Sequence, residues 1–253
     1  MEVNKGANLH TFLLYAAIGI FFFLFPLNLI QVQGYSPTAA GSAILRLILL
    51  MFLLSRWAGG LVVRSGSRGP LMVGPLIAAI GFALFSAPTV GDSYWESFFP
   101  AIIVLGFGMA VTVVPLTTVV MNSVNEDRAG TASGINNAVA RVAGVLAIAV
   151  VGIAMVKAFS LRLDRSLAGL CLPSDIRQEV QANEIKLAGL QLPAGLDPTA
   201  NAAIKESVRE AFVYGFRIVM SICVGLSLAS ASVAWLMIPP EHDRPRLPTD
   251  SSS

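Results

Sequence analysis

The residues best suited to chemistry in this sequence are polar side chains that interrupt long apolar stretches. Arg46 is the sharpest case, because it lies eight residues after Thr38 in a largely apolar stretch. In a helix this spacing puts Arg46 about 12 Å from Thr38, and a charge near mid-membrane costs at least ~2.5 kcal/mol and is usually paired or functional. Arg46 therefore needs carbonyls, water, an anion or a part of the protein outside this chain as its partner. Cavity lining competes with a tolerated substitution whose side chain snorkels to the surface.

Further polar candidates lie in the fifth and the first apolar stretches. Ser133, Asn137 and Arg141 recur at every fourth position, so on a helix they form one polar stripe. A neighbouring face of small residues, formed by Ala140, Ala143, Gly144 and Ala147, favours close packing of another helix. Asn28 and Gln31 follow Pro26 near the end of the first apolar stretch. Cavity lining and polar contacts between helices remain open for the candidate set Asn28, Gln31, Arg46, Asn137 and Arg141.

The sequence carries no pattern typical of an enzyme. His10 and His242 stand apart from any cysteine or carboxylate cluster with metal-ligand spacing, and no P-loop or G-x-S-x-G element is present. An intramembrane hydrolase needs a nucleophile with a base, or paired aspartates, within the bilayer, and the apolar stretches contain neither. We therefore expect no catalytic residues, no metal site and no cofactor. The net charge of +2 also gives no indication of nucleic-acid binding.

The apolar stretches themselves predict an all-α integral membrane protein in a lipid bilayer. The 253-residue chain is 55% hydrophobic and only 13% charged, whereas soluble domains carry about 25% charged residues. Helices of about 20 apolar residues span a bilayer and satisfy their own backbone groups. Six segments have this length: 11–31, 38–61, 70–88, 98–121, 133–156 and 211–238.

An even number of spans puts both termini on one side of the membrane. The links 32–37 and 88–97 contain no Lys or Arg, whereas the short links and ends on the other side are basic, which favours cytoplasmic termini. The long link 157–210 carries seven basic and seven acidic residues, so a bare count of Lys and Arg is a tie. We expect a cytoplasmic segment 1–10, an extracytoplasmic link 157–210 with short helices, and a disordered cytoplasmic tail 239–253. Ser174 is the expected cap of one short helix, and Asp197 with Pro198 is the expected start of a helix that continues into the last span.

A glycine-rich basic link joins the second and third spans. The stretch GGLVVRSGSRG resembles the cytoplasmic loop signature of the major facilitator superfamily, and the residues that match are Gly59, Leu61, Arg64, Gly66 and Arg68. The acidic position of that signature is Val63 here. Glycines permit the tight turn, and arginines can bond the carbonyls at a helix C-terminus. The segments PLNLIQVQGYSPTAAG, FFPAIIVLGFGMAVTVVPLTTVVM and AGTASGINNAVARVAG are similar to the second half of the fourteen-helix drug:proton antiporter branch.

This resemblance implies a fold and a function. It places the five matching residues in a cytoplasmic gate loop, in the plasma membrane of a bacterium, and implies export of small, amphipathic molecules by proton antiport. The substrate site of such transporters lies between two six-helix halves, and this chain opens just before what would be the ninth helix. We therefore expect it to supply one half, with a separate N-terminal half or a second copy as partner and the proton-coupling acid in the missing half.

Two alternatives to half of a transporter remain open for the function of this chain. The chain could be a non-transporting membrane protein, either a truncated relic or an assembly partner. It could also be a six-helix unit that pairs with itself to form a pore.

Overall fold

The structure is a computed structural model that describes residues 2–122, 124, 126–170, 173–190 and 197–238. The expected disordered tail 239–253 lies outside these residues. Among the described residues every regular element is helical, and six helices are long and apolar enough to cross a membrane. The expected all-α membrane fold with six spans is thereby confirmed.

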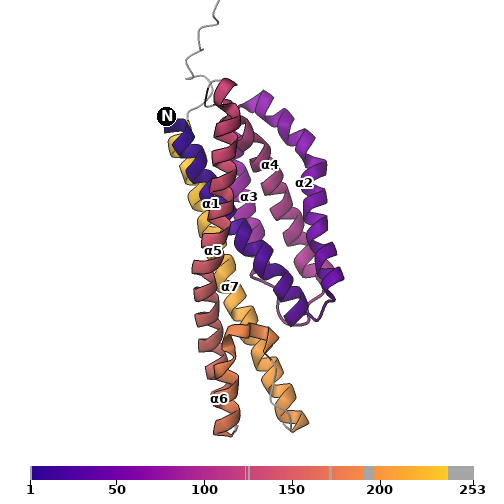
Figure 1. Ribbon diagram of the computed structural model, residues 1–253. Helices are drawn as coiled ribbons and strands as arrows, with labels where there is room; N and C mark the ends of the chain where they lie inside the picture. Colours follow the sequence, from indigo (N-terminus) through magenta and orange to yellow (C-terminus); the bar gives the residue numbers. More distant parts are fainter. Residues whose placement is uncertain (1, 123, 125, 171–172, 191–196, 239–253) are drawn as a thin grey trace, which may run out of the picture.

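The helices follow one another as an up-and-down bundle (Figure 1). In chain order the elements are α1 (Glu2–Leu27) with the π-helical turn η1 (Asn28–Val32), α2 (Pro37–Ser65), α3 (Arg68–Phe85), η2 (Tyr94–Phe98) leading into α4 (Phe99–Asn122), α5 (Glu126–Ala168), α6 (Ser174–Ala182), the 3₁₀ turn η3 (Glu184–Gly189), and α7 (Pro198–Met237).

Local sequence signals set several helix ends. Ser36 accepts a hydrogen bond from the backbone N–H of Ala39 and precedes Pro37, so α2 begins with an N-cap and a proline at its first position. Asp197 caps α7 by accepting from the N–H groups of Thr199 and Ala200, as expected. α6 begins at Ser174, but its N-cap is Pro173, one residue before the expected cap.

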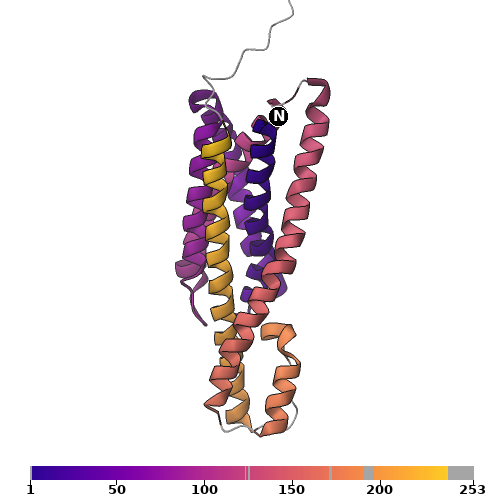
Figure 2. The same cartoon turned by 90° about the vertical axis from the view of Figure 1, so that its left-hand side faces the viewer.

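The helices are longer than the spans expected from hydropathy. Residues 2–10 belong to α1 rather than to a separate segment. The reason is tertiary packing, because Ala7 and His10 of that stretch are buried against other helices. α5 and α7 likewise run past the expected limits 156 and 211, and they project together beyond the rest of the bundle (Figures 1 and 2).

The projecting ends of α5 and α7 carry a folded hairpin made of α6 and η3. Val180 of α6 and Leu187 of η3 are buried in the main hydrophobic core. Gln181 donates to Asp164 of α5 at 2.8 Å, and the hydroxyl of Ser160 donates to Glu184. The long link is therefore a small packed unit at the end of the molecule opposite the N-terminus (Figure 2).

Close helix contacts hold the bundle together where glycines face each other. A Cβ added to Gly19 of α1 would lie 2.7 Å from the Cα of Gly144 in α5. This contact confirms the packing role expected for the small-residue face of α5. Polar contacts reinforce the same end of the bundle, since the Nδ1 of buried His10 lies 2.9 Å from the hydroxyl of Ser230 in α7.

α2 is the least embedded of the six spans. In its most apolar stretch only 17% of the residues are buried, against 56% in α1 and 61% in α4. α2 packs mainly along α4 and stands off from α1, as Figure 1 shows. An apolar cavity forms in the space between α1 and α2.

Candidate functional site

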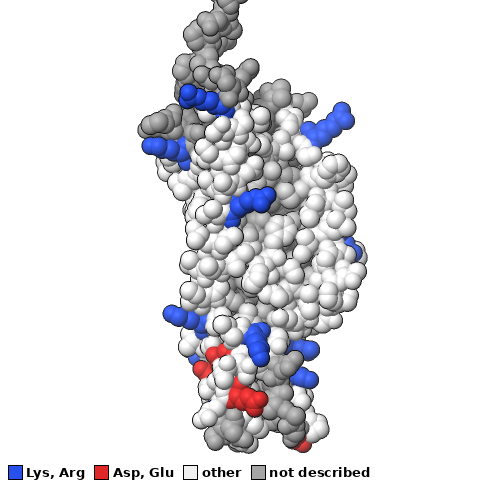
Figure 3. All heavy atoms as spheres, viewed as in Figure 1, with Lys and Arg blue, Asp and Glu red and all other residues white. Residues whose placement is uncertain are grey.

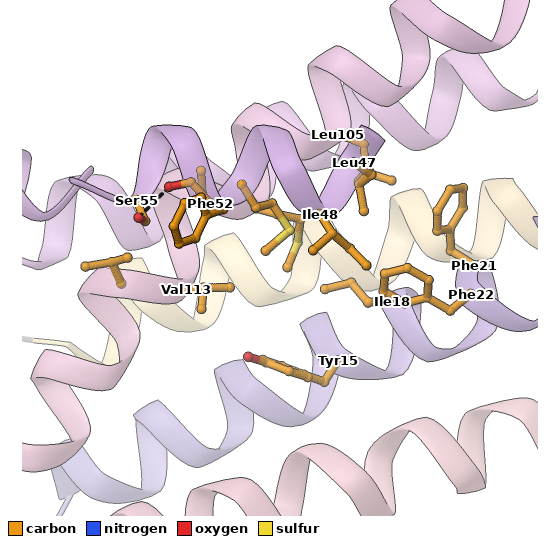
Figure 4. Close-up of a pocket in the computed structure, with 14 residues that line it drawn as sticks. Tyr15, Ile18, Phe21, Phe22, Leu47, Ile48, Phe52, Ser55, Leu105 and Val113 are labelled. Carbon is orange, nitrogen blue, oxygen red and sulfur yellow. Dashed lines mark hydrogen bonds between the residues drawn. The ribbon is translucent and has the colours of Figure 1, made fainter. Parts of the chain in front are cut away.

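An apolar cavity of about 410 Å³ opens between α1, α2 and α4 (Figure 4). Each helix contributes side chains at the spacing of one helical face. They are Tyr15, Ile18, Phe21 and Phe22 from α1, Leu47, Ile48, Met51, Phe52 and Ser55 from α2, and Leu105, Met109, Ala110, Val113 and Val114 from α4. The cavity has the size of a small-molecule site.

The lining is suited to apolar and aromatic molecules. Its side-chain polar groups are the hydroxyls of Tyr15 and Ser55, and the Ser55 hydroxyl already donates to the carbonyl of Phe52 at 2.6 Å. Met51 and Met109 are flexible and polarizable, so they adapt to ligands of different shape. A wall of this kind binds by burying apolar area and stacking rings, and it discriminates weakly between apolar ligands.

Phe52 sits at the open side of the cavity. Its exposed fraction is 73%, and that of its neighbour Leu53, which does not line the cavity, is 72%. The aromatic ring of Phe52 and the rings of Tyr15 and Phe22 on α1 belong to facing helices (Figure 4). A planar ligand entering between α1 and α2 would meet aromatic side chains from both helices.

Arg46 directly precedes the lining residue Leu47, but its side chain contacts aromatic rings outside the cavity. Its guanidinium carbon is 5.1 Å from the ring centroid of Tyr94 and 5.3 Å from that of Trp95, both in η2. These are cation–π distances. The partners expected from the sequence were carbonyls, water, an anion or a missing part of the protein. The aromatic rings of η2, which precede α4, were not among them.

The two candidates of the first span lie in η1. Asn28 is buried, and its Oδ1 has no hydrogen-bond partner among the described residues. Gln31 is half-buried beside Gly189 of the hairpin and lines a separate pocket of about 190 Å³ together with Lys205 and Arg209 of α7. Both amides therefore lie at the hairpin end of the bundle, outside the lining of the apolar cavity.

The polar stripe of α5 faces away from the bundle. Asn137 and Arg141 are exposed, and Ser133 is half-exposed. The neighbouring residue Asn136 points inward instead, and its Oδ1 accepts a hydrogen bond from the Thr11 hydroxyl at 2.6 Å. Sequence periodicity found the stripe but not this inward contact.

The glycine-rich link is a turn of two residues between α2 and α3. Gly66 has φ 70°, a conformation that favours glycine, and α3 begins two residues later at Arg68. Arg68 donates to the carbonyl of Trp235 at 2.5 Å, in the last turn of α7. Gly59 and Leu61 are half-buried in the final turns of α2. The side chain of Arg64 lies outside the described residues.

The structure thus brings together residues that the sequence analysis did not select. None of Asn28, Gln31, Arg46, Asn137 and Arg141 is among the residues that line the apolar cavity. The lining residues Tyr15, Phe22, Met51, Phe52 and Met109 are apolar or aromatic residues in apolar helices, where nothing in the sequence separates them from residues that face lipid. Among the described residues no group of three or more His, Cys, Asp or Glu could hold a metal ion.

Comparison with known proteins gives consistent matches. The family described as Major Facilitator Superfamily matches residues 5–148. The tetracenomycin C resistance and export protein of Streptomyces glaucescens is 29% identical over 238 residues, which are 92% of this chain and 44% of that protein. The lincomycin resistance protein of Streptomyces lincolnensis is 34% identical over 149 residues, 59% of this chain and 31% of that protein. The multidrug resistance protein Stp of Mycobacterium tuberculosis is 26% identical over 220 residues, 83% of this chain and 39% of that protein. The chain spans less than half the length of each of these relatives.

Proposed function

Because the chain belongs to the major facilitator superfamily, we propose that it supplies one bundle of a transporter that exports apolar or amphipathic small molecules. The observation that carries this proposal is the cavity of about 410 Å³ between α1, α2 and α4, with its nearly unbroken apolar and aromatic lining. Relatives described as resistance and export proteins support the same direction of transport and the same class of substrate.

A second bundle completes the transporter in this proposal. α2 and α5 are the least buried spans, with 17% and 22% of their most apolar stretches buried. The exposed face of α5 also carries Asn137 and Arg141, and an arginine facing lipid at that depth would cost at least ~2.5 kcal/mol. Contact with a second bundle, from a separate N-terminal half or a second copy, would remove these groups from lipid. Alternating access would then proceed by rocking of one bundle against the other.

Proton antiport is the proposed source of energy, with its coupling acid in the second bundle. The apolar segments 11–31, 38–61, 70–88, 98–121, 133–156 and 211–238 contain no Asp or Glu. Their charged residues are arginines, which do not release a proton at physiological pH. A carboxylate that gains and loses a proton in the membrane must then come from the partner.

The proposed location is the bacterial inner membrane with both termini in the cytoplasm. Arg56, Arg68 and Arg128 lie toward the end of the molecule that holds the N-terminus, which agrees with the positive-inside rule for short links. In this orientation the gate loop of Gly59, Leu61, Arg64, Gly66 and Arg68 is cytoplasmic. The bond from Arg68 to the end of α7 would then tie two cytoplasmic helix ends together.

Photolabelling tests the proposed substrate site. The purified chain in lipid nanodiscs is labelled with a photoreactive aromatic cation, and the labelled positions are mapped by mass spectrometry. We expect labels on the lining of the cavity, and a loss of about tenfold in labelling for Phe52→Ala, since an aromatic anchor contributes about 1.4 kcal/mol or more.

Leu53→Ala is the matched control, because Leu53 is as exposed as Phe52 but does not line the cavity. Labelling of this variant should stay within twofold of the unsubstituted protein. Equal losses in both variants, or labels scattered over the outer faces of the helices, would contradict a substrate site between α1, α2 and α4.

A further inference from the structure

A second, polar pocket lies at the hairpin end of the bundle, outside the proposed substrate cavity. Its volume is about 470 Å³, and its walls come from the link after α3, from α5 and from α7. The charged and polar residues in its lining are Thr89, Arg162, Glu206, Glu210, Tyr214 and Arg217. Acidic side chains visible in Figure 3 all gather at this end of the molecule.

The pocket lies at the hairpin-end limits of the apolar stretches of α3 and α7, where the membrane is expected to meet water. The lining residues Thr89 and Val90 follow the end of α3 at Phe85 within five residues, and Arg217 lies six residues inside the apolar segment 211–238 of α7. Tyr214, which is 42% exposed, has the amphipathic side chain that is enriched at headgroup level. In a membrane these positions would put the pocket beside the lipid headgroups of the leaflet at the hairpin end.

The wall formed by the link after α3 is held in place before any ligand binds. The backbone N–H of Thr89 donates to Asp92 at 2.7 Å, and its carbonyl accepts from the side chain of Gln33 at 2.9 Å. Arg217 donates through one nitrogen to the carbonyls of Ala87 and Pro88, at 3.1 and 3.3 Å. The pocket is thus a fixed recess and not a gap between loose loops.

Arg217 keeps donor capacity for an anion. The bonds to Ala87 and Pro88 use only the terminal nitrogen Nη2, and the other terminal nitrogen, Nη1, carries two further N–H donors. A guanidinium has five N–H donors and matches the geometry of phosphate oxygens. Arg162 adds a second guanidinium, which forms only a long ion pair of 3.6 Å with Glu210, and both of these side chains are about half exposed.

The charges are ordered along α7. Glu206, Glu210 and Arg217 fall on one helical face, and the rise per residue puts Arg217 about 10 Å deeper than Glu210 and about 16 Å deeper than Glu206. In a phospholipid the phosphate lies close to the acyl chains and an amine lies further toward water. Arg217 is the deep cationic group of the pocket and Glu206 its outermost carboxylate, while Arg162 lies beside Glu210 between them. The two arginines and two glutamates cancel in charge.

We propose that this pocket binds the headgroup of a zwitterionic phospholipid with a primary amine, of the phosphatidylethanolamine type. The phosphate contacts Arg217 on the deep side, and the ammonium donates to Glu206 and Glu210 on the water side. A choline headgroup has no N–H group to donate, and a glycerol headgroup has no positive charge, so neither fits both ends of the pocket. The lipid joins α5, α7 and the link after α3 at the membrane surface.

Native mass spectrometry of the full chain tests this assignment. The protein is released from nanodiscs of equal parts phosphatidylethanolamine, phosphatidylcholine and phosphatidylglycerol, and the lipids that remain bound are counted. We expect phosphatidylethanolamine to be retained about tenfold over phosphatidylcholine. Equal retention of the three lipids would overturn the proposal.

Two substitutions test the contacts of the amine and of the phosphate one at a time. Glu206→Gln should abolish the preference for phosphatidylethanolamine over phosphatidylcholine, because it removes a carboxylate that receives the ammonium. Arg217→Gln should lower retention of both lipids about tenfold. Since Arg217→Gln also loses the bonds to the α3 link, Glu206→Gln decides the matter if Arg217→Gln does not fold. A Glu206→Gln protein that keeps the full preference would contradict the assignment.

Controls distinguish the site from general charge effects and from a soluble ligand. Arg165→Gln and Glu179→Gln alter charged, exposed residues at the same end that do not line the pocket, and both should retain the preference. Thermal stabilisation of the protein is also compared between O-phosphoethanolamine and the lipid at the same concentration. Equal stabilisation by the two would show a site for the free phosphoamine and would overturn the lipid assignment. None of these measurements requires transport, so the result is independent of the proposed substrate site.

Discussion

At the scale of single residues, Arg46 shows how a charge is accommodated in an apolar helix without an acidic partner. Its guanidinium lies 5.1 Å from the ring centroid of Tyr94 and 5.3 Å from that of Trp95. The electron-rich ring faces attract the cation and provide a contact that lipid does not. This contact joins α2 to the turn that precedes α4, at the hairpin end of the apolar cavity.

Replacement of Arg46 should therefore destabilise the bundle. We expect Arg46→Gln to lower the free energy of unfolding by about 1 kcal/mol, the contribution of a partly desolvated cation–π pair. The measurement is a titration with sodium dodecyl sulfate in dodecylmaltoside micelles, followed by tryptophan fluorescence. Arg56→Gln removes an exposed arginine from the same helix and should change the free energy by less than about 0.5 kcal/mol. Equal effects of the two substitutions would contradict the pairing with η2.

The sequence shows that Arg46 needs a partner but not which one. Tyr94 and Trp95 belong to a segment nearly fifty residues further along the chain, and the sequence does not show that their rings come to lie beside Arg46. The same limit applies to the cavity lining. Phe22 lines the cavity and Phe23 does not, although both are phenylalanines in one apolar run. Only the position of α2 relative to α1 separates them.

At the scale of elements, hydropathy predicts the number and order of the spans, because only helices satisfy their backbone in lipid. Capping signals predict the start of α7 at Asp197 and Pro198. The start of α1 and the end of α5 escape both predictions. The added part of α1 is held by burial of Ala7 and His10 against other helices. The added part of α5 is held by the core that it shares with α7, which includes buried Leu163 and Ile204.

The contact between α1 and α5 depends on the absence of a side chain at Gly19, which lies against the backbone of Gly144. We expect Gly19→Ala to lower the free energy of unfolding by about 1–3 kcal/mol, since the new Cβ would lie 2.7 Å from backbone atoms of α5 and force the helices apart. The same detergent titration measures the change.

Gly41→Ala is the matched control for this prediction. A Cβ at Gly41 meets nothing within 4 Å, so the alanine should leave stability unchanged or raise it by up to about 1 kcal/mol through better helix propensity. A Gly19→Ala protein as stable as Gly41→Ala would show that α1 and α5 do not pack this closely.

At the scale of the whole molecule, the distribution of exposed surface is the main guide to function. α2 and α5 bury little of their apolar length, and the apolar cavity is open on the side of α2. In the proposed transporter these faces meet a second bundle, and the cavity becomes one wall of a site enclosed by both. The family was suggested by the loop and three further segments of the sequence, whereas the location of the cavity required the structure.

The central claim is that this chain forms a binding wall but needs a second bundle, with its proton-coupling acid, to drive export. Reconstitution tests it most directly. Proteoliposomes containing only this chain are loaded with a fluorescent aromatic cation and given a proton gradient, and a parallel set also contains the preceding eight helices of a related resistance transporter. We expect gradient-driven transport only in the second set. Proton-coupled transport by this chain alone would contradict the claim.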